Sequence, residues 1–179
     1  MTNPEHERHE GAANAVDKAQ DAIGGAVGMT SAKTVGSHSA KAFVDNAAQS
    51  NRYEIEAAEI ALSRSPSEQV RTLARQMIDD HRALGERLRG QAAAAGLQDE
   101  AAAELDQRRQ GMLDNLRTAP DGEFDRRYLD QQEMAHREAV ALFEGFAEHG
   151  DNADMQAAAN EALSVLRDHL EMVRQAKGH

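Results

Sequence analysis

The stretch RQMIDDHRALGERL, residues 75–88, decides the fold class and raises the question of function. Met77, Leu84 and Leu88 recur at the spacing of one face of an α-helix, so the stretch predicts an amphipathic helix with a buried apolar side. His81 lies among them on that same face. A histidine in this position is either a core residue with one hydrogen-bond partner or part of a polar site that several helices assemble.

The composition favours helices that pack on other helices. Only 3% of the 179 residues are aromatic, tryptophan is absent, and the chain has three prolines. A core built from Leu, Ile, Val, Met and Ala suits close helix packing better than a β-sandwich. The low proline content permits long helices. We therefore expect one all-α domain with an appendage.

The charge and the missing residue types exclude several functions. A formal net charge of −11 opposes binding to nucleic acid or to an anionic membrane surface. The absence of cysteine excludes disulfides, thiolate nucleophiles and cysteine-ligated zinc or iron–sulfur sites. The start, MTNPEHERHEGAANAV, does not resemble a secretory signal, and no apolar run approaches the roughly 20 residues that span a bilayer. We expect a cytoplasmic protein without membrane contact.

The chain divides into two parts. Residues 1–39 are rich in Gly and Ala and contain few large apolar side chains. Gly24, Gly25 and Gly28 would each destabilise a helix there by about 1 kcal/mol relative to alanine. This composition predicts a flexible N-terminal arm, with a peptide that binds a protein partner as the alternative. Residues 40–176 form the second part.

Four helical patterns follow in residues 40–176, and their breaks are marked by turn residues. Pro66 ends the first helix, Ser65 or Ser67 caps the second, Gly150 ends the third, and Asp151 or Asn152 caps the fourth. The short links predict two antiparallel hairpins. The link between them is long enough for a short helix. These patterns predict an up-down four-helix bundle with one long connection, with helices at residues 40–63, 68–95, 122–149 and 153–175 and the short helix within 97–121.

Each of the four helices places one titratable residue on its apolar face: Glu54, His81, His136 and His169. Glu54 lies 12 residues before Pro66 and His81 lies 15 after it, a mismatch of about one helical turn at roughly 1.5 Å per residue. His136 and His169 have a similar offset about the second turn. All four can therefore meet in one layer. Burying them without mutual partners would cost several kcal/mol, so the pattern predicts a clustered polar site with these residues as candidate metal ligands.

Three acidic residues are candidates for orienting the histidines. Asp80 and Asp168 directly precede His81 and His169 in the related stretches ARQMIDDH and ALSVLRDH. Neighbouring residues on a helix point about 100° apart, so each aspartate can reach the histidine of an adjacent helix and fix its ring. Glu133 lies one turn before its histidine in EMAH.

Four stretches together resemble a bacterial family described as ferritin-like, the domain of unknown function 4142: FVDNAAQSNRYEIEAAEIAL, VRTLARQMIDDHRALGERL, FDRRYLDQQEMAHREAVALFE and LRDHLEMV. The resemblance runs from about residue 40 to residue 174 and implies an up-down helical bundle, but it implies little about activity. Many members carry export signals, which the start of this chain does not resemble. A ferritin-like di-iron site needs two Glu-x-x-His pairs, and only EMAH has that form here, so we do not expect a di-iron centre.

These observations predict a metal-binding or stress-protective bundle in which no residue is identified as catalytic. Imidazoles with one carboxylate would suit zinc, iron, copper or manganese. The alternative is a structural or interaction module whose inward polar residues only fix the register of the helices. An oxidase or peroxidase would in addition need an open coordination position on the metal.

Overall fold

The computed structural model describes residues 38–97 and 104–178 of the chain. These residues are helical throughout apart from short turns, which confirms the all-α prediction. The four long helices are α2 (Ala40–Arg64), α3 (Glu68–Ala94), α5 (Phe124–His149) and α6 (Ala153–Lys177), and the connection between α3 and α5 carries the short helix α4 (Gln107–Thr118) and the 3₁₀ turn η2 (Asp121–Glu123). Each long helix begins and ends within two residues of the predicted boundary.

Side-chain caps mark the beginning of α2, α3 and α6 among the long helices. The hydroxyl of Ser67 accepts a hydrogen bond from the backbone N–H of Val70 at 3.4 Å and begins α3, and Asn152 accepts from Met155 at 3.0 Å and begins α6. Asp151 has a different role, because its carboxylate accepts from the backbone N–H of Ala40 at 2.8 Å. This bond joins the start of α2 to the turn between α5 and α6.

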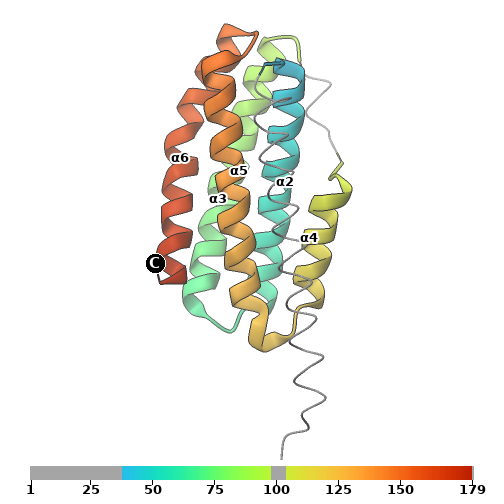
Figure 1. The fold of residues 1–179 in the computed structure, drawn as a ribbon, viewed down its shortest axis with the longest axis vertical. Coiled ribbons are helices and arrows are strands. Elements are labelled where there is room, and N and C mark those ends of the chain that lie inside the picture. Colours follow the sequence, from blue (N-terminus) through green and yellow to red (C-terminus); the bar gives the residue numbers. More distant parts are fainter. Residues whose placement is uncertain (1–37, 98–103, 179) are drawn as a thin grey trace, which may run out of the picture.

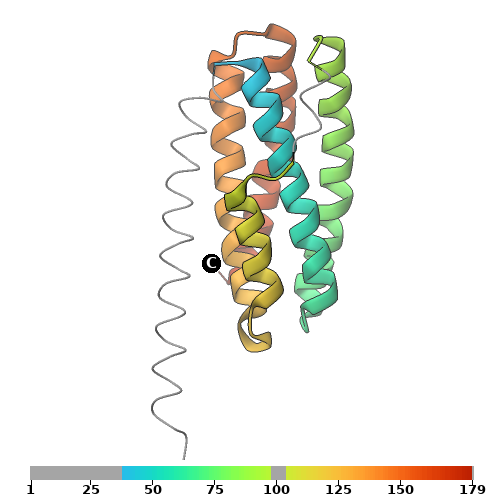
Figure 2. The same ribbon diagram turned by 90° about the vertical axis from the view of Figure 1, so that its right-hand side faces the viewer.

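The four long helices run side by side, each antiparallel to its two neighbours (Figure 1). α2 packs against α3 and α5, and α6 packs against the same two helices. The connection that carries α4 brings the chain back to the end of the bundle where α3 began, so α3 and α5 run in the same direction. α4 lies on the outside, against α2 and α5 (Figure 2).

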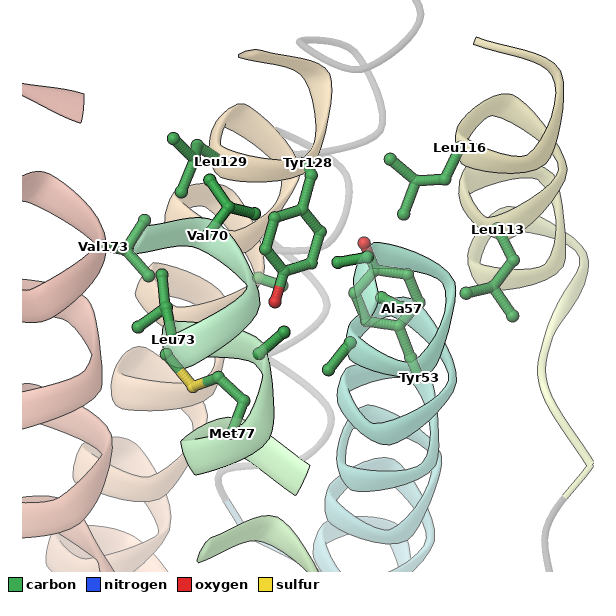
Figure 3. Close-up of a cluster of buried hydrophobic side chains, with 14 of the residues drawn as sticks. Tyr53, Ala57, Val70, Leu73, Met77, Leu113, Leu116, Tyr128, Leu129 and Val173 are labelled. Carbon is green, nitrogen blue, oxygen red and sulfur yellow. The ribbon is translucent and has the colours of Figure 1, made fainter. Parts of the chain in front are cut away.

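The apolar core consists of two separate clusters, which we call lower and upper after their places in Figure 1. The lower cluster includes Tyr53 and Tyr128 together with Leu113 and Leu116 of α4 (Figure 3). The upper cluster includes Phe43, Phe143 and Phe146, whose rings pack together with centroids 4.9 Å and 4.2 Å apart. Between the two clusters, the helices contribute polar side chains to the core.

The predicted N-terminal arm, residues 1–39, lies outside the described residues except for its last two. These two residues contact the bundle. The backbone carbonyl of His38 accepts a hydrogen bond from the backbone N–H of Asp151 at 3.0 Å, and Ser39 caps α2. None of the described helices combines the length and the apolar composition that a membrane span requires.

Candidate metal centre

Three buried histidines meet between the two apolar clusters, one from each of α3, α5 and α6. Nε2 of His136 lies 3.4 Å from Nε2 of His81 and 3.4 Å from Nδ1 of His169. One ring nitrogen from each histidine can be chosen so that all three lie within 4.8 Å of one another. All three side chains are almost completely inaccessible to solvent.

The other nitrogen of each ring, which points away from the centre, contacts an oxygen atom. For His81 this oxygen is the side-chain carbonyl of Asn51 at 3.0 Å, and for His136 it is the backbone carbonyl of Gln132 at 2.9 Å. For His169 it is the carboxylate of Asp80 at 2.9 Å. Carbonyl and carboxylate oxygens only accept hydrogen bonds. The outer nitrogen of each ring therefore carries the ring proton and donates a hydrogen bond to its oxygen partner.

The inner nitrogens are consequently unprotonated in the neutral rings, and three lone pairs point into one small space. Burial lowers the pKa of His136 to about 4, and burial together with the other two histidines lowers that of His81 well below its usual value. Burial also lowers the pKa of His169, although the hydrogen bond to Asp80 opposes this effect. At neutral pH the cluster is therefore three neutral imidazoles, the form in which histidine binds metals.

The spacing of the inner nitrogens fits a common metal geometry. With zinc–nitrogen bonds of about 2.0–2.1 Å, neighbouring ligands of a tetrahedral ion lie about 3.3 Å apart. The two inner nitrogen–nitrogen distances of 3.4 Å match this value. In its ligand type and in these two spacings, the donor set fits a small transition-metal ion.

The structure places Glu54 behind the triad and not among its inner nitrogens. Its Oε1 lies 3.5 Å from Nδ1 of His136, the outer nitrogen of that ring, and its Oε2 accepts a hydrogen bond from the side-chain amide of Gln132 at 2.6 Å. Burial raises the pKa of Glu54 to about 8, although the bond from Gln132 opposes this shift. The carboxyl group is therefore largely protonated at neutral pH.

The three acidic residues singled out from the sequence lie in different environments. Asp80, on the surface of α3, reaches across to His169 of α6, as described above. Glu133 of α5 instead accepts a hydrogen bond from Lys177 at 2.5 Å, which lowers its pKa. Asp168 is exposed on α6. Of the three, only Asp80 touches a histidine of the triad.

Sequence reasoning did not identify Asn51 and Gln132 as partners of the histidines. Their positions carried a usable signal, because Asn51 lies three residues before Glu54 and Gln132 lies four residues before His136. Residues three or four apart lie on the same face of a helix. A polar residue one turn from a predicted inward histidine or glutamate is therefore a candidate hydrogen-bond partner.

Comparison with known proteins identifies a family and one similar fold. The family model described as "Domain of unknown function (DUF4142)" matches residues 26–176. A solved structure titled "CopM in the Cu(II)-bound form" is similar, with a TM-score of 0.61 and 20% sequence identity, over 76% of this chain and 94% of that chain. At this identity the similarity supports the helical fold alone. None of the curated proteins matches the chain.

Proposed function

The chain belongs to the DUF4142 family, and we propose that it binds a transition-metal ion through His81, His136 and His169. The observation that carries the proposal is the oxygen acceptor beside the outer nitrogen of each ring, which places the ring protons on the outside of the triad. The inner nitrogens of His81 and His169 each lie 3.4 Å from that of His136, so three lone pairs face one another with no proton between them. A cation at their centre would relieve this repulsion.

The rival function, a polar layer that only fixes helix register, explains this arrangement less well. A buried network that serves structure alone is stabilising when all its members are hydrogen-bonded. Here the inner nitrogens have no donor between them. The buried oxygens Oε1 of Glu54 and Oε1 of Gln132 also have no hydrogen-bond partner among the described residues.

The donor set favours some metals over others. Imidazole nitrogen suits zinc, copper, iron and nickel, whereas manganese prefers carboxylate, carbonyl and water oxygens. Glu54 does not face the inner nitrogens, so the inner donors are nitrogen atoms only. We propose copper or zinc as the ion, with iron weaker and manganese weakest. The copper-bound state of the similar CopM structure is consistent with this order.

The proposed role is to hold the ion out of solution as a form of protection against metal stress. A site buried between two apolar clusters keeps a redox-active metal away from solvent. We also propose a ferritin-like topology, which the long connection between α3 and α5 supports, but without a di-iron centre. The cytoplasmic location expected from the sequence stays a prediction that cell fractionation would test.

Metal binding is tested on full-length protein purified without a histidine tag. Elemental analysis and titration with Zn²⁺, Cu²⁺ and Mn²⁺ should find one ion of zinc or copper per chain and weak binding of manganese. A hundredfold excess of metal over its dissociation constant should stabilise the fold by about 2.7 kcal/mol, seen as a rise in melting temperature. No binding and no rise in melting temperature would leave the structural network as the better account.

Two kinds of variant separate the triad from incidental histidine binding. His81→Gln and His136→Gln should each remove most of the stabilisation by metal, because only two of the three nitrogen ligands remain. His149→Gln is the matched control, since His149 is exposed at the end of α5. Equal loss in the control would mean that the ion binds elsewhere.

A further inference from the structure

We infer that Asn51 of α2 and Gly85 of α3 form a positioning pair that fixes the ring of His81 and so sets the metal affinity of the triad. The inference rests on the proposed function, but it also makes a separate claim about the metal-free protein. Neither residue would itself touch the ion. Asn51 acts through a hydrogen bond, and Gly85 acts by leaving space for Asn51.

The first observation is the contact between Asn51 and His81. The side-chain carbonyl of Asn51 lies 3.0 Å from Nδ1 of His81. This oxygen accepts a hydrogen bond from the protonated Nδ1. Nε2 of the same ring is therefore unprotonated and presents its lone pair to the other two histidines. Partners of this kind fix the tautomer and orientation of a metal-binding histidine and raise its basicity.

The second observation is that a side chain at position 85 would occupy the place of Asn51. Gly85 lies one helical turn after His81. A Cβ atom built there would lie 2.6 Å from Nδ2 of Asn51 and 3.4 Å from its Cγ. The first distance is shorter than van der Waals contact allows, so Asn51 can hold its present position only if residue 85 lacks a side chain.

The backbone gives no other reason for a glycine at this position. Gly85 lies in the interior of α3, where glycine is less stable than alanine. Its backbone has an ordinary helical conformation, whereas the described glycines with positive φ are Gly96 and Gly178. Gly90, on the same helix, has no atom within 4 Å of the corresponding Cβ position. Close approach by Asn51 is therefore what distinguishes Gly85.

Alanine at position 85 should change the site while leaving the fold intact. The atoms in its way belong to the end of a flexible side chain, which can rotate without moving the backbone. Asn51 would then release Nδ1 of His81, and the ring could turn or exchange its tautomer. Two ligands of the triad would remain oriented, and the third would have to be ordered when the metal binds.

The experiment compares full-length wild type with Gly85→Ala, Asn51→Ala and the control Gly90→Ala. Zn²⁺ affinity is measured by competition with a chromophoric chelator, and melting temperature is measured after removal of metal. We expect Gly85→Ala and Asn51→Ala each to weaken Zn²⁺ binding by about ten- to a hundredfold. Gly90→Ala should bind like the wild type, and none of the three glycine or asparagine variants should lose its helical circular dichroism.

The double variant Asn51→Ala/Gly85→Ala tests whether the two residues act together. If Gly85 acts only through Asn51, the second substitution should cause no further loss of Zn²⁺ affinity once Asn51 is removed. Asn51→Asp keeps an oxygen acceptor for Nδ1 and should retain the affinity. Additive losses, or a Gly85→Ala variant that binds as tightly as Gly90→Ala, would overturn the inference even though the wild type binds metal.

The nitrogen-15 chemical shifts of the His81 ring in metal-free protein provide a readout that does not depend on the ion. The wild type should show a protonated Nδ1 and an unprotonated Nε2, and Gly85→Ala should show a mixture of tautomers. A wild type that binds no metal but shows this difference would contradict the proposed function alone. The same tautomer in both proteins would contradict the positioning pair.

Discussion

The chemistry of the triad depends less on the histidines themselves than on the oxygen atoms around them. Asn51, Gln132 and Asp80 contact the outer nitrogen of one ring each and thereby direct three lone pairs toward one another. Burial between apolar clusters then keeps the rings neutral. A histidine on an apolar face would otherwise be an ordinary core residue with one hydrogen bond.

Each buried histidine should give the metal-free protein stability that is lost in acid, whereas Glu54, whose pKa is raised, contributes in the opposite direction. Each ring has a lower pKa in the folded state than the roughly 6.5 of an unfolded histidine, so the unfolded chain binds more protons. The stabilising contribution of each neutral ring is then fully present above about pH 6.5 and is lost as the pH falls toward the pKa of that ring in the folded protein. For His136, with a folded pKa of about 4, the loss is on the order of 3 kcal/mol.

Urea unfolding of chelator-treated wild type and His136→Gln at pH 7 and at pH 4.5 isolates this loss, because Glu54 makes its opposite contribution in both proteins. His136→Gln should lose less stability between the two pH values than the wild type, because one depressed group is gone. His149→Gln, which alters an exposed histidine, should show the wild-type difference. A His136→Gln variant with an unchanged difference would show that this ring titrates normally in the folded protein.

Among the helices, α4 shows how a single side chain can attach one element to another. Arg64, the last residue of α2, donates to the backbone carbonyls of Leu116 and Arg117 at 2.6 and 2.8 Å and to that of Ala119 at 2.7 Å. It thus satisfies carbonyl groups at the C-terminus of α4, where a positive charge is also favourable. Its guanidinium group lies 5.1 Å from the ring centroid of Phe124 as well.

Substitution of Arg64 should therefore destabilise the protein. Arg64→Ala removes several charge-assisted hydrogen bonds, and we expect a loss of about 2–3 kcal/mol in the free energy of unfolding by urea. Arg64→Lys should recover little of it, because an ammonium group cannot reach the same set of carbonyls. Arg82→Ala is the control, since its exposed pair with Glu59 should contribute less than about 1 kcal/mol. Equal effects at both positions would contradict this role for Arg64.

The helices themselves were predictable because local residue types mark their ends. Ser67, Asn152 and Pro66 lie where the helices start and stop, and the apolar spacing gives the buried faces. The contact between Arg64 and α4 was not predictable, because it joins residues more than fifty positions apart through backbone carbonyls that carry no sequence signal. The contact between Asn51 and His81 was not predictable for the same reason, because His81 lies on another helix.

The site illustrates the same division between local and long-range information. Helical phase and distance from the turns place Glu54, His81, His136 and His169 at one depth. They do not determine which ring nitrogen faces inward or that Glu54 lies behind His136. Those features depend on side-chain rotation and on hydrogen bonds between helices, and metal binding itself stays a prediction.

At the scale of the whole molecule, the polar layer divides the core while the backbone crosses it unbroken. All four long helices contribute side chains to both the lower and the upper cluster. Neither cluster can lose its packing without disturbing helices that also build the other. We therefore expect the metal-free protein to unfold in one cooperative transition in spite of the layer.

The placement of the tyrosines allows a direct test of this cooperativity. The chain has two tyrosines and no tryptophan, and both Tyr53 and Tyr128 lie in the lower cluster. Leu166 is buried in the upper cluster, and Leu166→Ala should cost about 3 kcal/mol. In a cooperative bundle, this variant shifts the urea midpoint of tyrosine fluorescence and that of far-ultraviolet circular dichroism together. Leu113→Ala in the lower cluster is the matched control. A fluorescence midpoint that stays at the wild-type value in Leu166→Ala would mean that the polar layer separates two independently stable halves, and a metal held by the triad would then join them.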